Sequence, residues 1–178
     1  MSESSRKFKI NRKTSDKYTE IANILCIKHA DWGGFLVQHE LDFFKRNYYQ
    51  LRPNSPMVAA WFKQKKKTLD QEGVNQPYSI RMPQSLVDDL GGWCKQYRVS
   101  KEMIVEYALE AFIQRVDVGR AAYKKLKRHE LMPLFLLEHS FKARLTETEK
   151  ISFIRENILI QEHMLPGDFR KEFKESKK

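Results

Sequence analysis

The sequence predicts a mainly helical protein with one short β-strand near its centre. Residues 78–82 alternate apolar and polar side chains with period two, which is typical of a strand that buries one face. Apolar residues recur at helical spacing on both sides of this strand. An isolated strand is not stable in water, and no partner strand is evident nearby. We therefore expect residues 78–82 to pair with the same segment of a second chain.

Residues 1–70 are expected to form a basic, helical N-terminal region. Residues 4–13 are predicted to be a mobile basic arm or a frayed terminus, although residues 7–11 alternate enough for a short strand. Apolar spacing then predicts three helices, and Asp31-Trp-Gly-Gly34 is expected to end the first of them. The third begins at Pro56 and ends in the lysine run Lys65, Lys66 and Lys67. The sequence shows no internal repeat, and polar residues 70–76 are typical of a linker.

Residues 77–118 are expected to form one compact module. Pro83 ends the strand, and two helices joined by a very short connection follow. Gly91 and Gly92 lie within the first helix, where each costs roughly 1 kcal/mol relative to alanine; they indicate very close packing or a loose turn. Ser100 is the expected N-cap of the second helix. The apolar residues of this module are expected to form a dimer core: Tyr78, Ile80, Met82, Leu86, Leu90, Trp93, Ile104, Tyr107, Ala108 and Phe112.

Residues 119–178 are expected to form a helical C-terminal region with a charged tail. Val118-Gly119-Arg120 is predicted to end or bend the preceding helix. Thr146 and Glu149 have the spacing of a capping box, which predicts a helix start there. The tail from Asp168 to Lys178 is expected to fray.

The segments Tyr78-Ser-Ile-Arg-Met-Pro-Gln-Ser-Leu and Val99-Ser-Lys-Glu-Met-Ile-Val-Glu-Tyr-Ala-Leu resemble the ribbon-helix-helix family of DNA-binding proteins, the Arc, MetJ and CopG type. The resemblance covers about 40 of the 178 residues. In that family, two chains pair their strands into an antiparallel ribbon that enters the major groove.

The resemblance implies roles for individual residues. Ser79 and Arg81 would contact base edges; Pro77 stands where the family usually has a third polar side chain, and Gln76 is a substitute for it. Backbone N–H groups at the start of the second helix, at Val99, Ser100 and Lys101, would hold a phosphate. The alternative is that Arg81 is a surface residue of an ordinary edge strand and that Ser100 only caps a helix.

The chain is strongly basic, with 33 Lys and Arg against 23 Asp and Glu and a net charge of +10. Such a balance favours polyanions as partners, although it also serves solubility. Residues 77–118 are nearly neutral, so the excess lies in the flanks. We therefore expect the flanks, with Lys65, Lys66 and Lys67, to contact phosphates and the module to supply specificity.

Other classes of function find little support in the sequence. No apolar run approaches the roughly 18 residues of a membrane span, and the N-terminus lacks the apolar core of a signal peptide. Cys26 and Cys94 lie on apolar helical faces, which indicates buried thiols in a reducing compartment. The histidines are scattered, so we expect no metal, no cofactor and no enzymatic activity.

These observations favour a cytoplasmic, nucleoid-associated homodimer that binds a specific sequence of double-stranded DNA, most simply as a transcriptional repressor. The sequence does not decide whether dimers assemble into a higher oligomer on DNA. The same fold also serves plasmid maintenance, relaxosome accessories and antitoxins. A different class is a helical protein-interaction protein that uses the module only to dimerise. A third, an RNA-binding protein or a nuclease, would need exposed aromatics or carboxylate pairs that the sequence does not place.

Overall fold

Two β-α-α units follow one another along the chain. The computed structural model describes residues 3–24, 27–47, 56–126, 146 and 148–149. The first unit contains β1 (Glu3–Asn11), α1 (Arg12–Ile24) and α2 (His29–Asn47). The second contains β2 (Asn75–Pro83), α4 (Gln84–Tyr97) and α5 (Lys101–Leu126). The helix α3 (Pro56–Glu72) lies between them in the sequence. The mainly helical prediction is confirmed.

The strand β2 pairs with β1 of the same chain. The two strands form an antiparallel two-stranded sheet in which Glu3 lies opposite Pro83 and Asn11 lies opposite Asn75. This corrects the argument for pairing between two chains, because that argument depended on β2 having no partner nearby. The basic segment expected to be an arm or a frayed terminus is that partner. We call this sheet the β1–β2 ribbon.

The two units are related by an approximate two-fold axis through the centre of the β1–β2 ribbon. Equivalent positions differ by 72 in the numbering, as do Asn11 and Pro83 at the ends of the strands. Lys7 and Ser79 are equivalent by this rule, and they are also directly opposite one another in the ladder. A two-fold axis must therefore pass between them. The sequence shows no repeat because equivalent side chains differ in chemistry.

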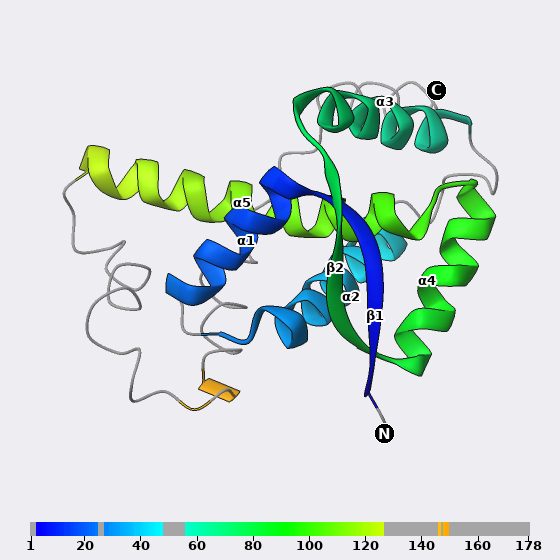
Figure 1. Cartoon of the computed structure of the whole chain (residues 1–178), viewed down its shortest axis with the longest axis horizontal. Coiled ribbons are helices and arrows are strands. Elements are labelled where there is room, and N and C mark those ends of the chain that lie inside the picture. The colour runs from blue at the N-terminus through cyan, green and yellow to red at the C-terminus, as the bar shows by residue number, and fades with distance from the viewer. Residues whose placement is uncertain (1–2, 25–26, 48–55, 127–145, 147, 150–178) are drawn as a thin grey trace.

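A pair of hydrogen bonds outside the strands follows the same rule. After α1, the N–H of Ile27 donates to the carbonyl of Ala22 at 2.9 Å; after α4, the N–H of Val99 donates to the carbonyl of Cys94 at 3.1 Å. Figure 1 shows the matching arrangement of the helices, with α1 and α4 on opposite sides of the ribbon. Both units therefore share one architecture, including the turn between their two helices.

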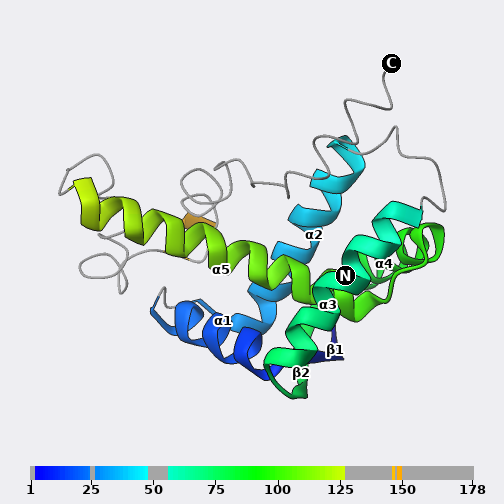
Figure 2. The same cartoon turned by 90° about the horizontal axis from the view of Figure 1, so that it is seen from above.

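A single core joins the two units. The helices α2 and α5 pack against each other under the ribbon, where they cross (Figure 2). All the apolar residues expected in a dimer core are buried except Tyr78, which is partly buried, but they pack against side chains of α1 and α2 in the same chain. The core thus does not divide at residues 70–77. In addition, α3 inserts Phe62 against Phe44, Trp93 and Tyr107.

Gly33 and Gly34 lie inside α2, which runs without a break from His29 to Asn47. The expectation that they end a helix is wrong, because their role is to let β2 approach. A Cβ atom on Gly34 would lie 2.1 Å from the carbonyl oxygen of Arg81, and one on Gly33 would lie 3.1 Å from the Ile80 side chain. Gly92 in α4 has nothing within 4 Å of such an atom. The close packing considered for the second glycine pair is therefore found at the first pair.

Two expectations for the C-terminal region fall on described residues. The helix α5 continues past Gly119 to Leu126, so the expectation that it ends at residues 118–120 is wrong. The capping box is confirmed: the Thr146 N–H donates to Glu149 Oε2 at 2.7 Å, and the Glu149 N–H donates to Thr146 Oγ1 at 3.3 Å. The charged tail from residue 168 lies outside the described residues.

Candidate nucleic-acid interface

The β1–β2 ribbon has one buried face and one exposed face. Successive side chains of a strand point to opposite faces, so residues of like parity share a face of this ladder. The even-numbered Phe8, Ile10, Ile80 and Met82 are buried in the core. Six odd-numbered residues in the central part of the ladder are exposed and form the outer face: Ser5, Lys7, Lys9, Pro77, Ser79 and Arg81. We call this set the outer ribbon face.

The outer ribbon face is polar and basic, and β1 supplies most of its charge. Together the two strands contain four basic residues and one acidic residue, Glu3. Three of the basic residues, Lys7, Lys9 and Arg81, lie on the outer face. From the sequence, only residues of β2 were considered for this face, so Ser5, Lys7 and Lys9 were not placed on it. Their signal was present, since polar residues 5, 7 and 9 alternate with the apolar residues 8 and 10.

The structure places Arg81 on the outer ribbon face, as expected from strand periodicity. Its side chain is 56% exposed, and its Nη1 lies 3.2 Å from Oδ1 of Asp31 in the first turn of α2. This partly exposed ion pair holds the guanidinium at one end of the ribbon. Ser79, the other residue expected to contact bases, is exposed at the centre of the ribbon opposite Lys7.

Gln76 does not lie on the outer face. It has the parity of the buried side chains, and its Nε2 donates to Ser15 Oγ at 2.7 Å and to Asp16 Oδ1 at 3.2 Å near the start of α1. The expectation that Gln76 substitutes for Pro77 as a base contact is therefore wrong. Pro77 itself is exposed, and Lys9 lies directly opposite it. The polar group missing at Pro77 is thus supplied by the facing strand.

The starts of α2 and α5 lie on opposite sides of the ribbon (Figure 1). Ser100 is exposed and caps α5 by accepting a hydrogen bond from the Met103 N–H at 3.3 Å, which confirms the predicted N-cap. Val99 is buried and its N–H donates to the Cys94 carbonyl, so the expectation that it holds a phosphate is wrong; Lys101 is partly buried. The equivalent positions at the start of α2 are Lys28, which is exposed, and His29.

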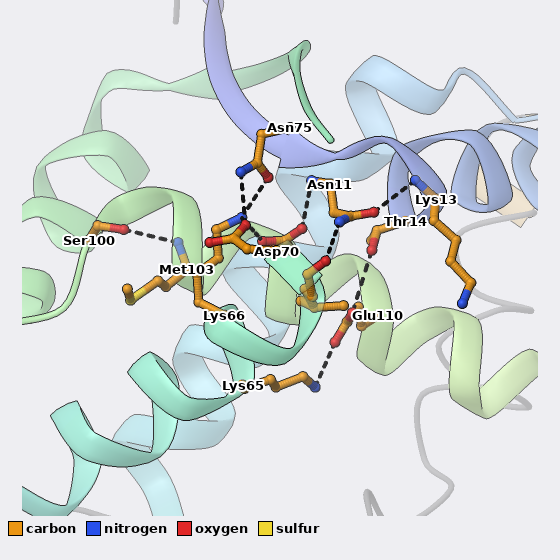
Figure 3. A network of polar contacts seen from close by, with 12 residues as sticks. Asn11, Lys13, Thr14, Lys65, Lys66, Asp70, Asn75, Ser100, Met103 and Glu110 are labelled. Carbon is orange, nitrogen blue, oxygen red and sulfur yellow. Dashed lines mark hydrogen bonds and ion pairs between the residues drawn. The ribbon is translucent and has the colours of Figure 1, made fainter. Parts of the chain in front are cut away.

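Two of the three lysines expected to contact phosphate are engaged inside the protein. Lys66 Nζ lies 2.7 Å from Glu106 Oε2, 3.1 Å from Asp70 Oδ1 and 2.7 Å from Asn75 Oδ1 (Figure 3). Lys65 Nζ lies 2.7 Å from Glu110 Oε2. Their side chains are only 15% and 25% exposed, so the assignment of Lys65 and Lys66 to phosphate is corrected. Lys67 is exposed.

The polar network around Lys66 fixes one end of the ribbon. Burial lowers the pKa of Lys66, but its hydrogen bonds to Glu106 and Asp70 outweigh that effect and raise the pKa above the ordinary value. Glu106 also accepts a hydrogen bond from the Asn11 N–H at 2.6 Å, with its Oε1. The network therefore ties α3 and α5 to the end of β1 and the start of β2.

The described part of the chain offers little for other chemistry. No group of three or more His, Cys, Asp or Glu residues among the described positions is arranged to hold a metal ion. None of the described helices is long and apolar enough to cross a membrane. Burial raises the pKa of the Cys94 thiol to about 12, which makes it inert at neutral pH and confirms a buried thiol there. Cys26 lies outside the described residues.

Comparisons of the chain with protein-family models, with curated proteins and with solved structures found no match.

Proposed function

We propose that this protein binds a specific sequence of double-stranded DNA by placing the outer ribbon face in the major groove. The observation that carries the proposal is the exposed, basic face of a two-stranded antiparallel ribbon whose other face is buried in the core. The major groove of B-DNA is about 12 Å wide and admits a two-stranded β-ribbon. The resemblance of β2, α4 and α5 to the ribbon-helix-helix family supports the same mode of binding.

The side chains on the outer ribbon face suit base edges. Arginine and lysine donate hydrogen bonds to O6 and N7 of guanine, and a serine hydroxyl can donate or accept. Lys7 and Lys9 are exposed and form no ion pair with any other described residue, so their charges are available to a ligand. The starts of α2 and α5 lie on either side of the ribbon, and backbone N–H groups at a helix start that have no partner can support contacts to phosphate, as at Ser100 and Lys101.

Transcriptional repression is the biological role that this mode of binding implies most directly. A protein seated in the major groove of a promoter excludes other proteins from the same DNA. Protection footprinting on the region around the protein's own coding sequence would locate such a site. Protection confined to sites distant from any promoter would instead favour a role in DNA maintenance.

Alanine in place of Lys9 or Arg81 is expected to weaken binding to the specific duplex by about 1–3 kcal/mol, because each change removes hydrogen bonds to a base edge. Binding to random duplex should weaken much less, and the protein should stay folded because both side chains are exposed. The measurement is a pair of titrations, on selected and on random duplex, at several salt concentrations. Lys63→Ala is the matched control, since it removes an equal charge from an exposed position on α3.

Two results would contradict this prediction. Equal losses on both duplexes would show that the outer ribbon face touches only phosphate. Wild-type binding that does not weaken as the salt concentration rises would overturn the proposal of DNA binding, because phosphate neutralisation makes protein–DNA affinity strongly salt-dependent.

Asparagine in place of Asp31 is expected to tighten DNA binding a few-fold. The change releases Arg81 from an exposed ion pair worth about 0–1 kcal/mol and removes a negative charge beside the ribbon. Asp89→Asn is the control, because it removes the same charge from the ion pair between Lys45 of α2 and Asp89 of α4. Weaker binding by the Asp31 variant alone would show that the ion pair orients Arg81 for its contact.

A further inference from the structure

The two ends of the β1–β2 ribbon differ in chemistry. Along the outer ribbon face the opposed pairs are Ser5 with Arg81, Lys7 with Ser79 and Lys9 with Pro77. A ribbon made from two identical strands would present the same pair at both ends. Here one end offers a guanidinium and a hydroxyl, while the other offers an ammonium group and a proline ring. The backbone of the ribbon therefore has approximate two-fold symmetry, but the side chains on the outer ribbon face do not.

Equivalent positions of α2 and α5, beneath the two ends of the ribbon, also carry different residues. Arg81 pairs with Asp31, whereas the residue equivalent to Asp31 in α5 is Met103, so Lys9 has no matching carboxylate. Gly34 in α2 allows β2 to approach closely, whereas the equivalent Glu106 in α5 accepts the Asn11 N–H. The two ends of the ribbon thus differ in their contacts to the helices below as well as in their exposed side chains.

We propose that a single molecule of this protein recognises a DNA site that lacks two-fold symmetry and binds it in one orientation. The proposal rests on the proposed function, in which the outer ribbon face enters the major groove. Arg81 with Ser5 reads a guanine at one end of the site, through the two hydrogen bonds that arginine makes to O6 and N7. At the other end Pro77 has neither donor nor acceptor, so Lys9 provides the polar contact and the proline ring suits a thymine methyl group.

Selection of binding sequences from randomised duplexes tests this directly. The expected consensus has two different halves, and native mass spectrometry of the complex should find one chain per duplex. Two palindromes are then built, each by repeating one half of the consensus in inverted orientation. The wild type should bind each palindrome about tenfold more weakly than the natural order, since one mismatched base pair typically costs about 1–3 kcal/mol.

The variant K7S/K9R/P77S makes the two strands equivalent on the outer ribbon face, with serine, serine and arginine on each. It should lose the preference for the natural order and bind the palindrome of the Arg81 half at least as well. The control K7S changes only the central pair on the two-fold axis, so it should lower affinity for all duplexes and keep the preference.

An inverted-repeat consensus for the wild type, or two chains on the shortest selected site, would overturn this inference and leave the proposed function intact. A symmetrised variant that retains the wild-type preference would overturn it as well. Failure to select any duplex, with no retention at low salt, would overturn the proposed function and the inference with it.

Discussion

Replacing Gly34 with alanine is expected to lower the free energy of unfolding by about 3 kcal/mol or more, the upper part of the range for overpacked sites. The added Cβ would lie 2.1 Å from the carbonyl oxygen of Arg81. That oxygen belongs to the backbone of β2, which is held by its ladder to β1, so it cannot move aside as a flexible side chain would. The strand must shift away from α2, which also displaces Arg81.

Chemical denaturation measures this effect, and Gly92→Ala is its matched control. Gly92 is exposed within α4, and nothing lies within 4 Å of a Cβ placed there. Alanine should therefore stabilise the protein by up to about 1 kcal/mol through its higher helix propensity. A Gly34→Ala protein as stable as the wild type would show that α2 and β2 are not in the close contact described.

Replacing Arg115 with alanine is expected to cost about 3–5 kcal/mol of stability, because it leaves a buried carboxylate without its partner. Arg115 Nη1 lies 2.5 Å from Oε1 of Glu40 where α5 meets α2, and both side chains are at most 5% exposed. Removing both charges is different: the double variant E40M/R115M fills the same space with apolar atoms and should recover most of the stability. A double variant no more stable than Arg115→Ala would contradict this account of the pair.

The stability of the wild type should also depend on pH through Glu40. Burial raises the pKa of this carboxyl, and Arg115 lowers it only in part, so the folded-state pKa stays above the ordinary value of 4.5. Between the unfolded-state pKa and the higher folded-state pKa of Glu40, the folded protein binds more protons than the unfolded chain. Glu40 therefore makes the free energy of unfolding fall as the pH rises through that window. In Arg115→Ala the pKa of Glu40 should rise further, and the fall in the free energy of unfolding should extend to higher pH. Denaturation at several pH values, with E40Q/R115A as the control, isolates this contribution.

Local periodicity was enough to predict the second unit of the fold. The strand expected at residues 78–82 lies within β2, and Leu86, Leu90 and Trp93, which were expected in the apolar core, are buried on α4. These predictions succeeded because alternation and helical spacing depend on residues close in the sequence. Arg81 and Ser79 were placed on the correct face for the same reason.

The helices of the first unit were predicted, but its strand pairing and its close contacts were missed because these depend on residues far apart in the sequence. The sequence shows the conformational cost of Gly33 and Gly34, but not the strand that comes close to them from more than 40 residues away. The lysine run at residues 65–67 looked available for phosphate because its partners, Glu106 and Glu110, belong to another helix. Equivalent positions of the two units, such as Tyr18 and Leu90, share burial and not identity, so the repeat became visible only in the backbone.

Carrying both strands on one chain makes the assembly of the ribbon a first-order process. A ribbon shared between two molecules falls apart when the protein is diluted below its dissociation constant, whereas the tethered strands of this chain keep a fixed effective concentration. The midpoint of ribbon unfolding should then be the same at nanomolar and micromolar protein. In a cell with only a few copies of this chain, every copy would still have both strands of the ribbon paired.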